Sequence, residues 1–355
     1  MKKKLITIIN CIIIIGILSG MFDVLSEVFI PRYVYQNTNA PTTATVEGFY
    51  KIKRNTVDLL ILGTSHCING VIPQEIYNET GIRTYNLASE QQSLFLSYYL
   101  LREALKYQNP QAVVLDTQFV QSFHDEYPIN MGDELFRKVS DRMRFSPLKV
   151  EMIQDYCRLN NSDEKISYLI PVVRYHSRWS SMTRDDLEVL TWTKHNELKG
   201  FYPLYHVGYR GFEPLTIEGN DTIPMDPIMR EYLERITGIC KDKNIKLVLF
   251  RTPGTGSTVE IHNEIAAYAK ANDVLFYDFN EKSLYERLDI KEPEESAIEP
   301  DGGEHANLPA AAKISGLLAE LLKENGVTGQ KDDQWESTKD YYEHIFLDPE
   351  YVKRK

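Results

Sequence analysis

The chain has 355 residues, of which 43% are hydrophobic and 26% are charged, and its formal net charge at pH 7 is −11. These proportions are typical of a globular protein and exclude a largely disordered chain. The acidic balance and the lack of a long basic run argue against nucleic acid as a partner. The four cysteines have the spacing of neither a zinc site nor a disulfide framework, so we expect free thiols at Cys11, Cys67, Cys157 and Cys240. We expect no metal and no cofactor.

Residues 1–30 predict a membrane anchor. Lys2, Lys3 and Lys4 precede an uncharged apolar segment, Leu5 to Phe22. As a helix, this segment would span roughly 27 Å, close to the thickness of a bilayer core. The lysines favour a cytoplasmic N-terminus, which would place the rest of a single-pass cell-membrane protein outside the cytoplasm. A cleaved signal peptide is the alternative, although the apolar segment is long for one.

Residues 31–55 are predicted to form a stalk. They contain Pro31, Pro41 and a Thr-rich patch at 42–45, which favour an extended linker, with a short helix near 46–53. At the other end, residues 329–355 form a charged tail, which we expect to be a peripheral helix or a disordered end.

The pattern of residues 56–328 predicts one α/β domain. Strands are expected at 57–62, 81–87, 111–115, 245–250 and 274–277. Helices are expected at 72–77, 93–107, 226–243, 259–271 and 309–325. Because strands alternate with helices through short connections, the sheet is predicted to be parallel.

An insertion at about 117–225 interrupts this pattern and is predicted to be mainly helical. Its basic and aromatic stretch supplies three candidate substrate-binding residues, Arg174, His176 and Arg178. The insertion is placed to form a cap over a site at the sheet edge. Its aromatic residues Trp179 and Phe201 have an alternative interpretation, as the insertion's own small core.

The first strand ends in Gly63, Thr64, Ser65 and His66. Glycine permits a sharp turn at a strand end. Open α/β sheets bind their ligands at the carboxyl ends of the strands, and we therefore interpret Ser65 as a nucleophile. Cys67 is the alternative nucleophile, two residues further on.

The loop before the last helix supplies a base for this serine. A serine hydroxyl becomes a good nucleophile when a histidine removes its proton and a carboxylate orients that histidine. The loop contains Asp301 and His305, which we predict to be the orienting group and the base. The alternative interpretation is a surface loop in which Asn307 caps the following helix.

These motifs resemble those of the SGNH/GDSL hydrolases. The sequence Gly63-Thr64-Ser65 is similar to the first family block, Gly-Asp-Ser, with threonine in place of aspartate. The segment from Asn86 to Gln91 is similar to the second block, with glutamine in place of its final glycine. The segment from Asp301 to His305 is similar to the last block and is one residue longer. The third block, Gly-x-Asn-Asp, is absent, and Asp116-Thr117-Gln118 stands at its place.

The resemblance implies a three-layer α/β/α flavodoxin-like fold and acyl chemistry on a serine. It implies that oxyanion donors come from the backbone N–H groups of Ser65 and Gln91 and from the side chain of Gln118. His66 and Arg251, at strand ends, join the candidate substrate-binding residues. The closest branch is membrane-anchored and extracytoplasmic, and includes proteins of lipoteichoic acid D-alanylation and of alginate and peptidoglycan O-acetylation.

We therefore expect O-acetyl transfer to a cell-envelope polysaccharide, or its removal, beside a membrane-bound O-acyltransferase. Transfer and hydrolysis differ in whether water is excluded from the acyl-enzyme, which leaves both open. One alternative is a catalytically inactive SGNH-like protein that binds glycan or serves as a scaffold for the acyltransferase. Another is a soluble-type lipase, which the polar insertion disfavours.

Overall fold

The computed structural model describes residues 2–31, 44–121, 128–188, 197–205, 207, 212–254, 256–291, 294–295 and 305–347. Five parallel strands form one sheet in the order β2-β1-β3-β4-β5. They are β1 (Leu59–Leu62), β2 (Thr84–Asn86), β3 (Ala112–Asp116), β4 (Lys246–Arg251) and β5 (Leu275–Asp278). This is the flavodoxin-like strand order, so the predicted fold class is confirmed.

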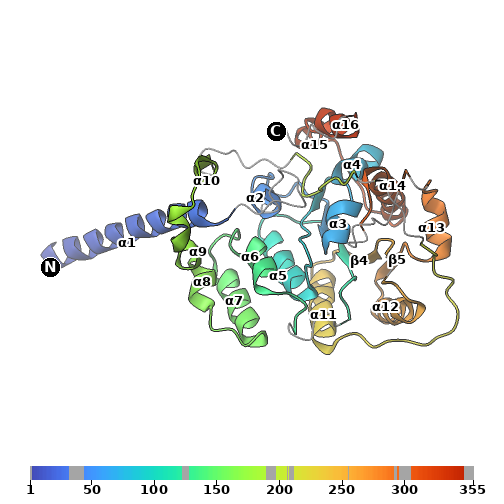
Figure 1. Ribbon diagram of the computed structural model, residues 1–355, viewed down its shortest axis with the longest axis horizontal. Helices are drawn as coiled ribbons and strands as arrows, with labels where there is room; N and C mark the ends of the chain where they lie inside the picture. Colours follow the sequence, from blue (N-terminus) through green and yellow to red (C-terminus); the bar gives the residue numbers. More distant parts are fainter. Residues whose placement is uncertain are drawn as a thin grey trace.

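Helices cover both faces of the sheet (Figure 1). Because side chains alternate along a strand, Leu60 and Val113 face one core while Leu59 and Val114 face the other. The first core is completed by α5 (Leu94–Ala104), α7 (Pro147–Leu159), α11 (Pro227–Asp242) and α12 (Val259–Asn272). The second is completed by α3 (Ser65–Gly70), α4 (Pro73–Thr80), α13 (Lys282–Leu288) and α14 (Leu308–Glu324).

The strand register aligns the carboxyl ends of the central strands. Leu62 of β1 is paired with Leu115 of β3, and Asp116 is paired with Phe250 of β4. The residues that follow β1, β3 and β4 therefore emerge at the same edge of the sheet. This edge is where the sequence places Ser65.

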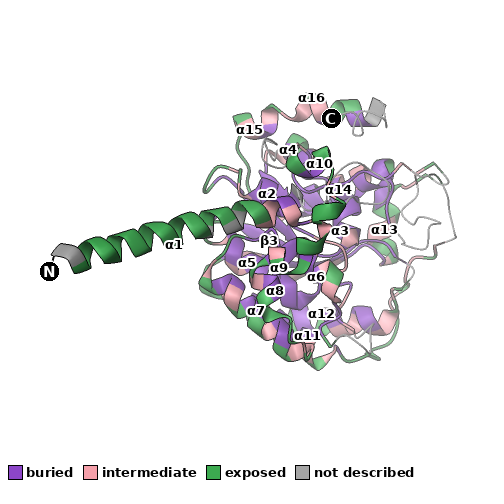
Figure 2. Ribbon diagram, turned by 60° about the vertical axis from the view of Figure 1, so that its left-hand side comes forward, coloured by how far each residue is buried: buried purple, intermediate pink, exposed green. Residues whose placement is uncertain are grey.

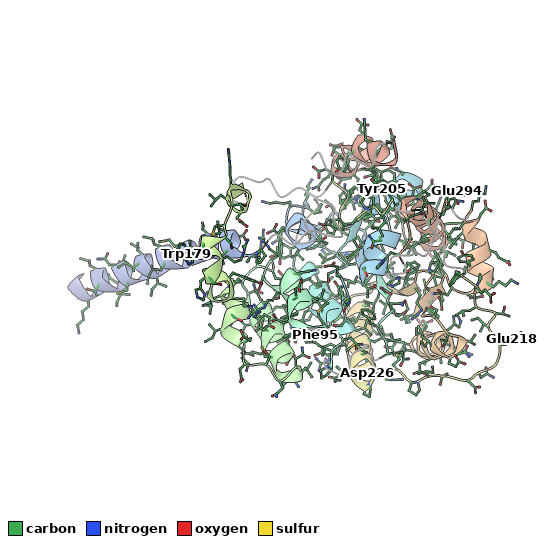
Figure 3. The ribbon with its side chains drawn as sticks, in the orientation of Figure 1. Phe95, Trp179, Tyr205, Glu218, Asp226 and Glu294 are labelled. Carbon is green, nitrogen blue, oxygen red and sulfur yellow. The ribbon has the colours of Figure 1, made fainter. Side chains whose placement is uncertain are left out.

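The insertion consists mainly of short helices in its described part. They are α6 (Asp133–Ser140), α7, α8 (Lys165–Leu169), α9 (Pro171–Tyr175), the 3₁₀ helix η1 (His176–Ser180) and α10 (Arg184–Glu188). Phe201 is buried, as expected of a core residue, whereas Trp179 is 73% exposed beside α1 (Figure 3). Phe201 packs in the second core of the α/β domain, so the prediction that these aromatic residues form a separate core of the insertion holds for neither residue.

Helix α1 (Lys2–Phe29) projects from the domain and carries exposed apolar side chains from Leu5 to Leu25 (Figure 2). Among the described residues, no helix combines the length and the apolar character needed to cross a membrane. The transmembrane helix predicted for residues 1–30 is thus not found. The last turns of α1 instead belong to the folded domain, since Val28 is buried and Glu27 lies 3.6 Å from Arg142.

The predicted stalk and tail are also packed against the domain. Within the stalk, α2 (Ala44–Phe49) buries Phe49 in the first core, and Tyr85 Oη donates a hydrogen bond to the carbonyl of Thr45 (2.7 Å). In the tail, α15 (Asp333–Glu336) and α16 (Lys339–Leu347) follow α14. Trp335 is fully buried and donates its indole N–H to the carbonyl of Thr84 (3.1 Å). The described part of this tail is therefore ordered structure and not a disordered end.

Candidate active site

Ser65 is the first residue of α3 and follows the carboxyl end of β1. Thr64 caps this helix, because its Oγ1 accepts a hydrogen bond from the backbone N–H of His66 (3.2 Å). Thr64 and His66 are buried, whereas Ser65 is partly exposed. The serine is therefore the member of this turn that solvent reaches most readily.

Gly63 is required by the close approach of Asp116. A Cβ atom at Gly63 would lie 2.3 Å from the Cβ of Asp116, which is the last residue of β3. Non-bonded carbon atoms are in contact at about 3.5–4.0 Å, so no side chain fits here. The glycine was predicted for a sharp turn, and the structure adds this second reason for it.

His305 reaches Ser65 from the far end of the chain. Its Nε2 lies 2.8 Å from Ser65 Oγ, within hydrogen-bond distance. His305 is buried and lies just before α14, whose first turn is capped by Asn307, the Oδ1 of which accepts from the N–H of Ala310 (3.2 Å). The predicted serine–histidine pair and the predicted helix cap therefore occur together. Asp301, the third predicted member, lies outside the described residues.

A second histidine, His66, flanks the same serine. Its ring centroid is 5.1 Å from that of His305, and its Nδ1 lies 3.3 Å from Thr252 Oγ1. Burial lowers the pKa of His66 to about 4, and the nearby Arg251 guanidinium contributes in the same direction. His66 is therefore neutral at pH 7, and only one of its two ring nitrogens carries a hydrogen.

The candidate oxyanion residues lie in loops that are attached to the Ser65 turn. Gln118 donates its backbone N–H to Asp116 Oδ1 (2.8 Å), and Asp116 also binds Thr64. Gln91 lies in the turn between β2 and α5 with a φ of +46°, a conformation that glycine adopts most easily. Ser89 joins this turn to the site by donating its N–H to the carbonyl of Gly63 (3.0 Å).

Arg251 joins the loops that follow β3 and β4. It is buried at the end of β4, where Nη1 donates to the carbonyl of Thr117 (3.0 Å) and Nη2 donates to Ser257 Oγ (2.9 Å). Its guanidinium is engaged within the protein, and its role as a substrate-binding residue stays a prediction.

The three candidate substrate-binding residues of the insertion lie away from Ser65. Arg174 lies 3.6 Å from Asp133, and His176 Nδ1 lies 2.9 Å from the carbonyl of Val173. Arg178 donates to the carbonyl of Phe29 in α1 and to Asp186. These residues belong to α9 and η1, which pack against α1 and are well separated from α3 (Figure 1). Their predicted position at the site is wrong because the insertion directs them toward α1.

Cys67 is a poor alternative nucleophile. It is fully buried in the second core, and burial together with the Asp116 carboxylate raises the pKa of its thiol well above the ordinary value. A protonated thiol is a weak nucleophile. The other cysteines are free thiols as predicted: Cys11 is exposed, and Cys157 and Cys240 are buried.

Asp116 and Thr252 are the site residues that the sequence did not single out. Asp116 accepts hydrogen bonds from Thr64, and Thr252 contacts His66. Asp116 had a signal in the sequence, since it is a carboxylate at the end of an otherwise apolar strand. Thr252 had none beyond its place after β4.

No family model matches the chain, and no curated protein sequence matches it. A solved structure that is similar to the chain is a GDSL-like lipase from Bacteroides thetaiotaomicron, at 11% sequence identity. The match covers 80% of this chain and 99% of that chain, with a TM-score of 0.36. The resemblance to SGNH hydrolases seen in the sequence motifs stays a prediction.

Proposed function

We propose that this protein performs serine-dependent acyl-ester chemistry, with Ser65 as the nucleophile and His305 as its general base. The observation that carries the proposal is the 2.8 Å separation of His305 Nε2 and Ser65 Oγ. A general base must lie within hydrogen-bond reach of the proton that it removes, and this pair meets that requirement without rearrangement. Asp301 is proposed, from the sequence motif, to orient His305.

The reaction proceeds in two halves. His305 Nε2 takes the hydroxyl proton while Ser65 Oγ attacks the ester carbonyl, and the resulting tetrahedral species collapses as the alcohol leaves with the proton from His305. The product is an acyl-serine. In the second half, His305 takes a proton from water or from an acceptor hydroxyl, that oxygen attacks the acyl group, and Ser65 recovers its proton.

Negative charge on the carbonyl oxygen needs hydrogen-bond donors. We propose the backbone N–H of Ser65, which opens helix α3 and has no partner within it, as one donor. The loops that carry Gln91 and Gln118 are tied to the same turn, and these residues are the proposed further donors. The neutral imidazole of His66 is proposed to face the substrate.

Three further predictions from the sequence are part of this proposal and stay predictions. They are a cell-envelope polysaccharide as donor or acceptor of the acyl group, a membrane-bound O-acyltransferase as partner, and a location outside the cytoplasm. The catalytically inactive alternative predicts no need for a serine–histidine hydrogen bond, so the contact between Ser65 and His305 favours the enzyme.

The test compares p-nitrophenyl acetate hydrolysis by the wild-type chain, Ser65→Ala and Ser180→Ala. Ser180 is an exposed serine on η1 and controls for the loss of a hydroxyl group away from α3. We expect Ser65→Ala to reduce hydrolysis to the background rate and Ser180→Ala to retain the wild-type rate. Equal rates for Ser65→Ala and the wild type would exclude Ser65 as the nucleophile for this ester.

A further inference from the structure

The loop that carries Ser65 is held by one buried carboxylate. Asp116, at the end of β3, is only 4% exposed. Its Oδ2 accepts hydrogen bonds from both the backbone N–H (3.0 Å) and the Oγ1 hydroxyl (2.6 Å) of Thr64. Its Oδ1 accepts from the backbone N–H of Gln118 (2.8 Å). A single side chain thus joins the turn after β1 to the turn after β3.

Thr64 transmits this constraint to Ser65. Its hydroxyl donates to Asp116 and accepts from the N–H of His66, so the same oxygen acts as donor and as acceptor. These two bonds fix the residues on either side of Ser65. The space at Gly63 is also filled by Asp116, which leaves the turn little freedom to shift.

The carboxylate is present despite an electrostatic cost. Burial raises the pKa of Asp116, and the hydrogen bonds from Thr64 and Gln118 and the charge of Arg251 oppose that shift. An apolar side chain in place of Asp116 would leave the backbone N–H groups of Thr64 and Gln118 without this acceptor, which is costly in a buried turn. The groups that donate hydrogen bonds to Asp116 belong to Thr64 and Gln118, in the turns that follow β1 and β3.

We propose that Asp116, acting through the hydroxyl of Thr64, is a positioning residue for Ser65 and for the oxyanion candidate Gln118. This inference rests on the proposed function. Asp116 does not contact the substrate. It sets the direction of the Ser65 side chain toward His305 and the separation of the two turns.

Two variants of Thr64 and one of Asp116 separate positioning from packing. Asp116→Asn keeps the shape of the side chain but presents an amide N–H₂ group to a donor. Thr64→Val keeps the shape and removes the hydroxyl, whereas Thr64→Ser keeps the hydroxyl. The control is Asp58→Asn, at the opposite end of the same β1 strand region, where a buried carboxylate binds Arg83 (2.7 Å).

The measurement is kcat and KM for p-nitrophenyl acetate, together with the urea midpoint of each variant. We expect Asp116→Asn and Thr64→Val to lower kcat by about 10- to 100-fold with KM within about twofold, since small misplacements of reacting groups act on the chemical step. Thr64→Ser should restore kcat to within about threefold. Asp58→Asn should lower the urea midpoint while its kcat stays near the wild-type value.

The proposal is overturned if Asp116→Asn and Thr64→Val keep the wild-type kcat, whatever their stability, or if Asp58→Asn loses kcat to the same extent. It is also overturned if Thr64→Ser is as slow as Thr64→Val, because the hydroxyl would then not be the element that acts. Failure of the proposed function has a different signature, namely equal turnover by the wild type and Ser65→Ala, and it removes the positioning role with it.

Discussion

His305 Nε2 lies 2.8 Å from Ser65 Oγ, although the two residues are 240 positions apart in the chain. The parallel sheet accounts for this meeting. Ser65 follows the carboxyl end of β1, and His305 precedes α14, which packs against α3 on the same face. The fold therefore brings the two side chains together. The distance between their atoms is within the range over which a general base can take a proton from a hydroxyl group.

Replacing the base should slow the reaction without unfolding the protein. We expect His305→Gln to lower kcat for p-nitrophenyl acetate by about 10²- to 10⁴-fold, the usual contribution of a general base. His176→Gln is the matched control, since His176 is an exposed histidine on η1. Its kcat should equal that of the wild type. An unchanged kcat in His305→Gln would contradict the role given to His305.

His66 should make the protein less stable in acid. Its pKa is about 4 in the folded state, against 6.5 for an ordinary histidine. Between these two values the unfolded chain binds a proton that the folded chain does not, so the free energy of unfolding falls as pH drops from 6.5 toward 4. The loss attributable to His66 approaches about 3 kcal/mol.

The measurement for His66 is urea unfolding at pH 4.5 and pH 7.5, for the wild type and His66→Gln. Other groups titrate in both proteins, so the difference between the two pH dependences isolates His66. We expect the variant to lose less stability than the wild type between pH 7.5 and 4.5. Identical losses in the two proteins would show that His66 titrates alike in the folded and unfolded states.

Alanine should be tolerated at one glycine and not at another. A Cβ at Gly63 would lie 2.3 Å from Asp116 Cβ, whereas nothing lies within 4 Å of a Cβ at Gly238 in α11. We expect Gly63→Ala to cost about 1–3 kcal/mol and to reduce kcat, because the backbone beside Ser65 must move. Gly238→Ala should stabilise the helix by about 0.5–1 kcal/mol. Thermal melts and ester turnover check both, and a fully active Gly63→Ala would refute the tight approach of β1 and β3.

Truncation to alanine should lower the stability of the fold strongly at Trp335 and hardly at all at Trp179. Trp335 is fully buried, donates to the carbonyl of Thr84 and lies under the ammonium group of Lys199. Trp335→Ala should lower the free energy of unfolding by about 3–5 kcal/mol. Trp179→Ala, at a 73% exposed site, should change it by less than about 0.5 kcal/mol. A small effect at Trp335 would mean that the tail does not contribute to the fold.

The sheet was predictable because its strands are buried on both faces. Such strands appear as continuous apolar runs, as in residues 57–62 and 111–115, and Gly81 or Asn109-Pro110 separates them from the neighbouring helices. All five expected strands are present, with boundaries shifted by a few residues. The strand order depends on long-range pairing and was implied only by the resemblance.

The candidate site was predictable only in part. The serine and the histidine have short motifs at element boundaries, and these motifs led to Ser65 and His305. A basic residue in the insertion does not show from the sequence which part of the fold it will contact. Arg174 binds Asp133 of α6, and Arg178 binds Phe29 of α1 and Asp186. Asp116 was overlooked because its role depends on the register between β1 and β3, which the sequence does not show. The packing of the tail was not predictable, because its charged sequence conceals buried side chains, Trp335, Tyr342 and Ile345 among them.

The most direct test of the central claim is covalent labelling of the wild-type protein with a fluorophosphonate, followed by peptide mass spectrometry. Such reagents react with serine hydroxyls that an adjacent base activates. We expect one adduct, on the peptide that contains Ser65, with slower labelling in His305→Gln and none at this position in Ser65→Ala. An adduct on another residue, or labelling of Ser65 at an unchanged rate in His305→Gln, would contradict the central claim.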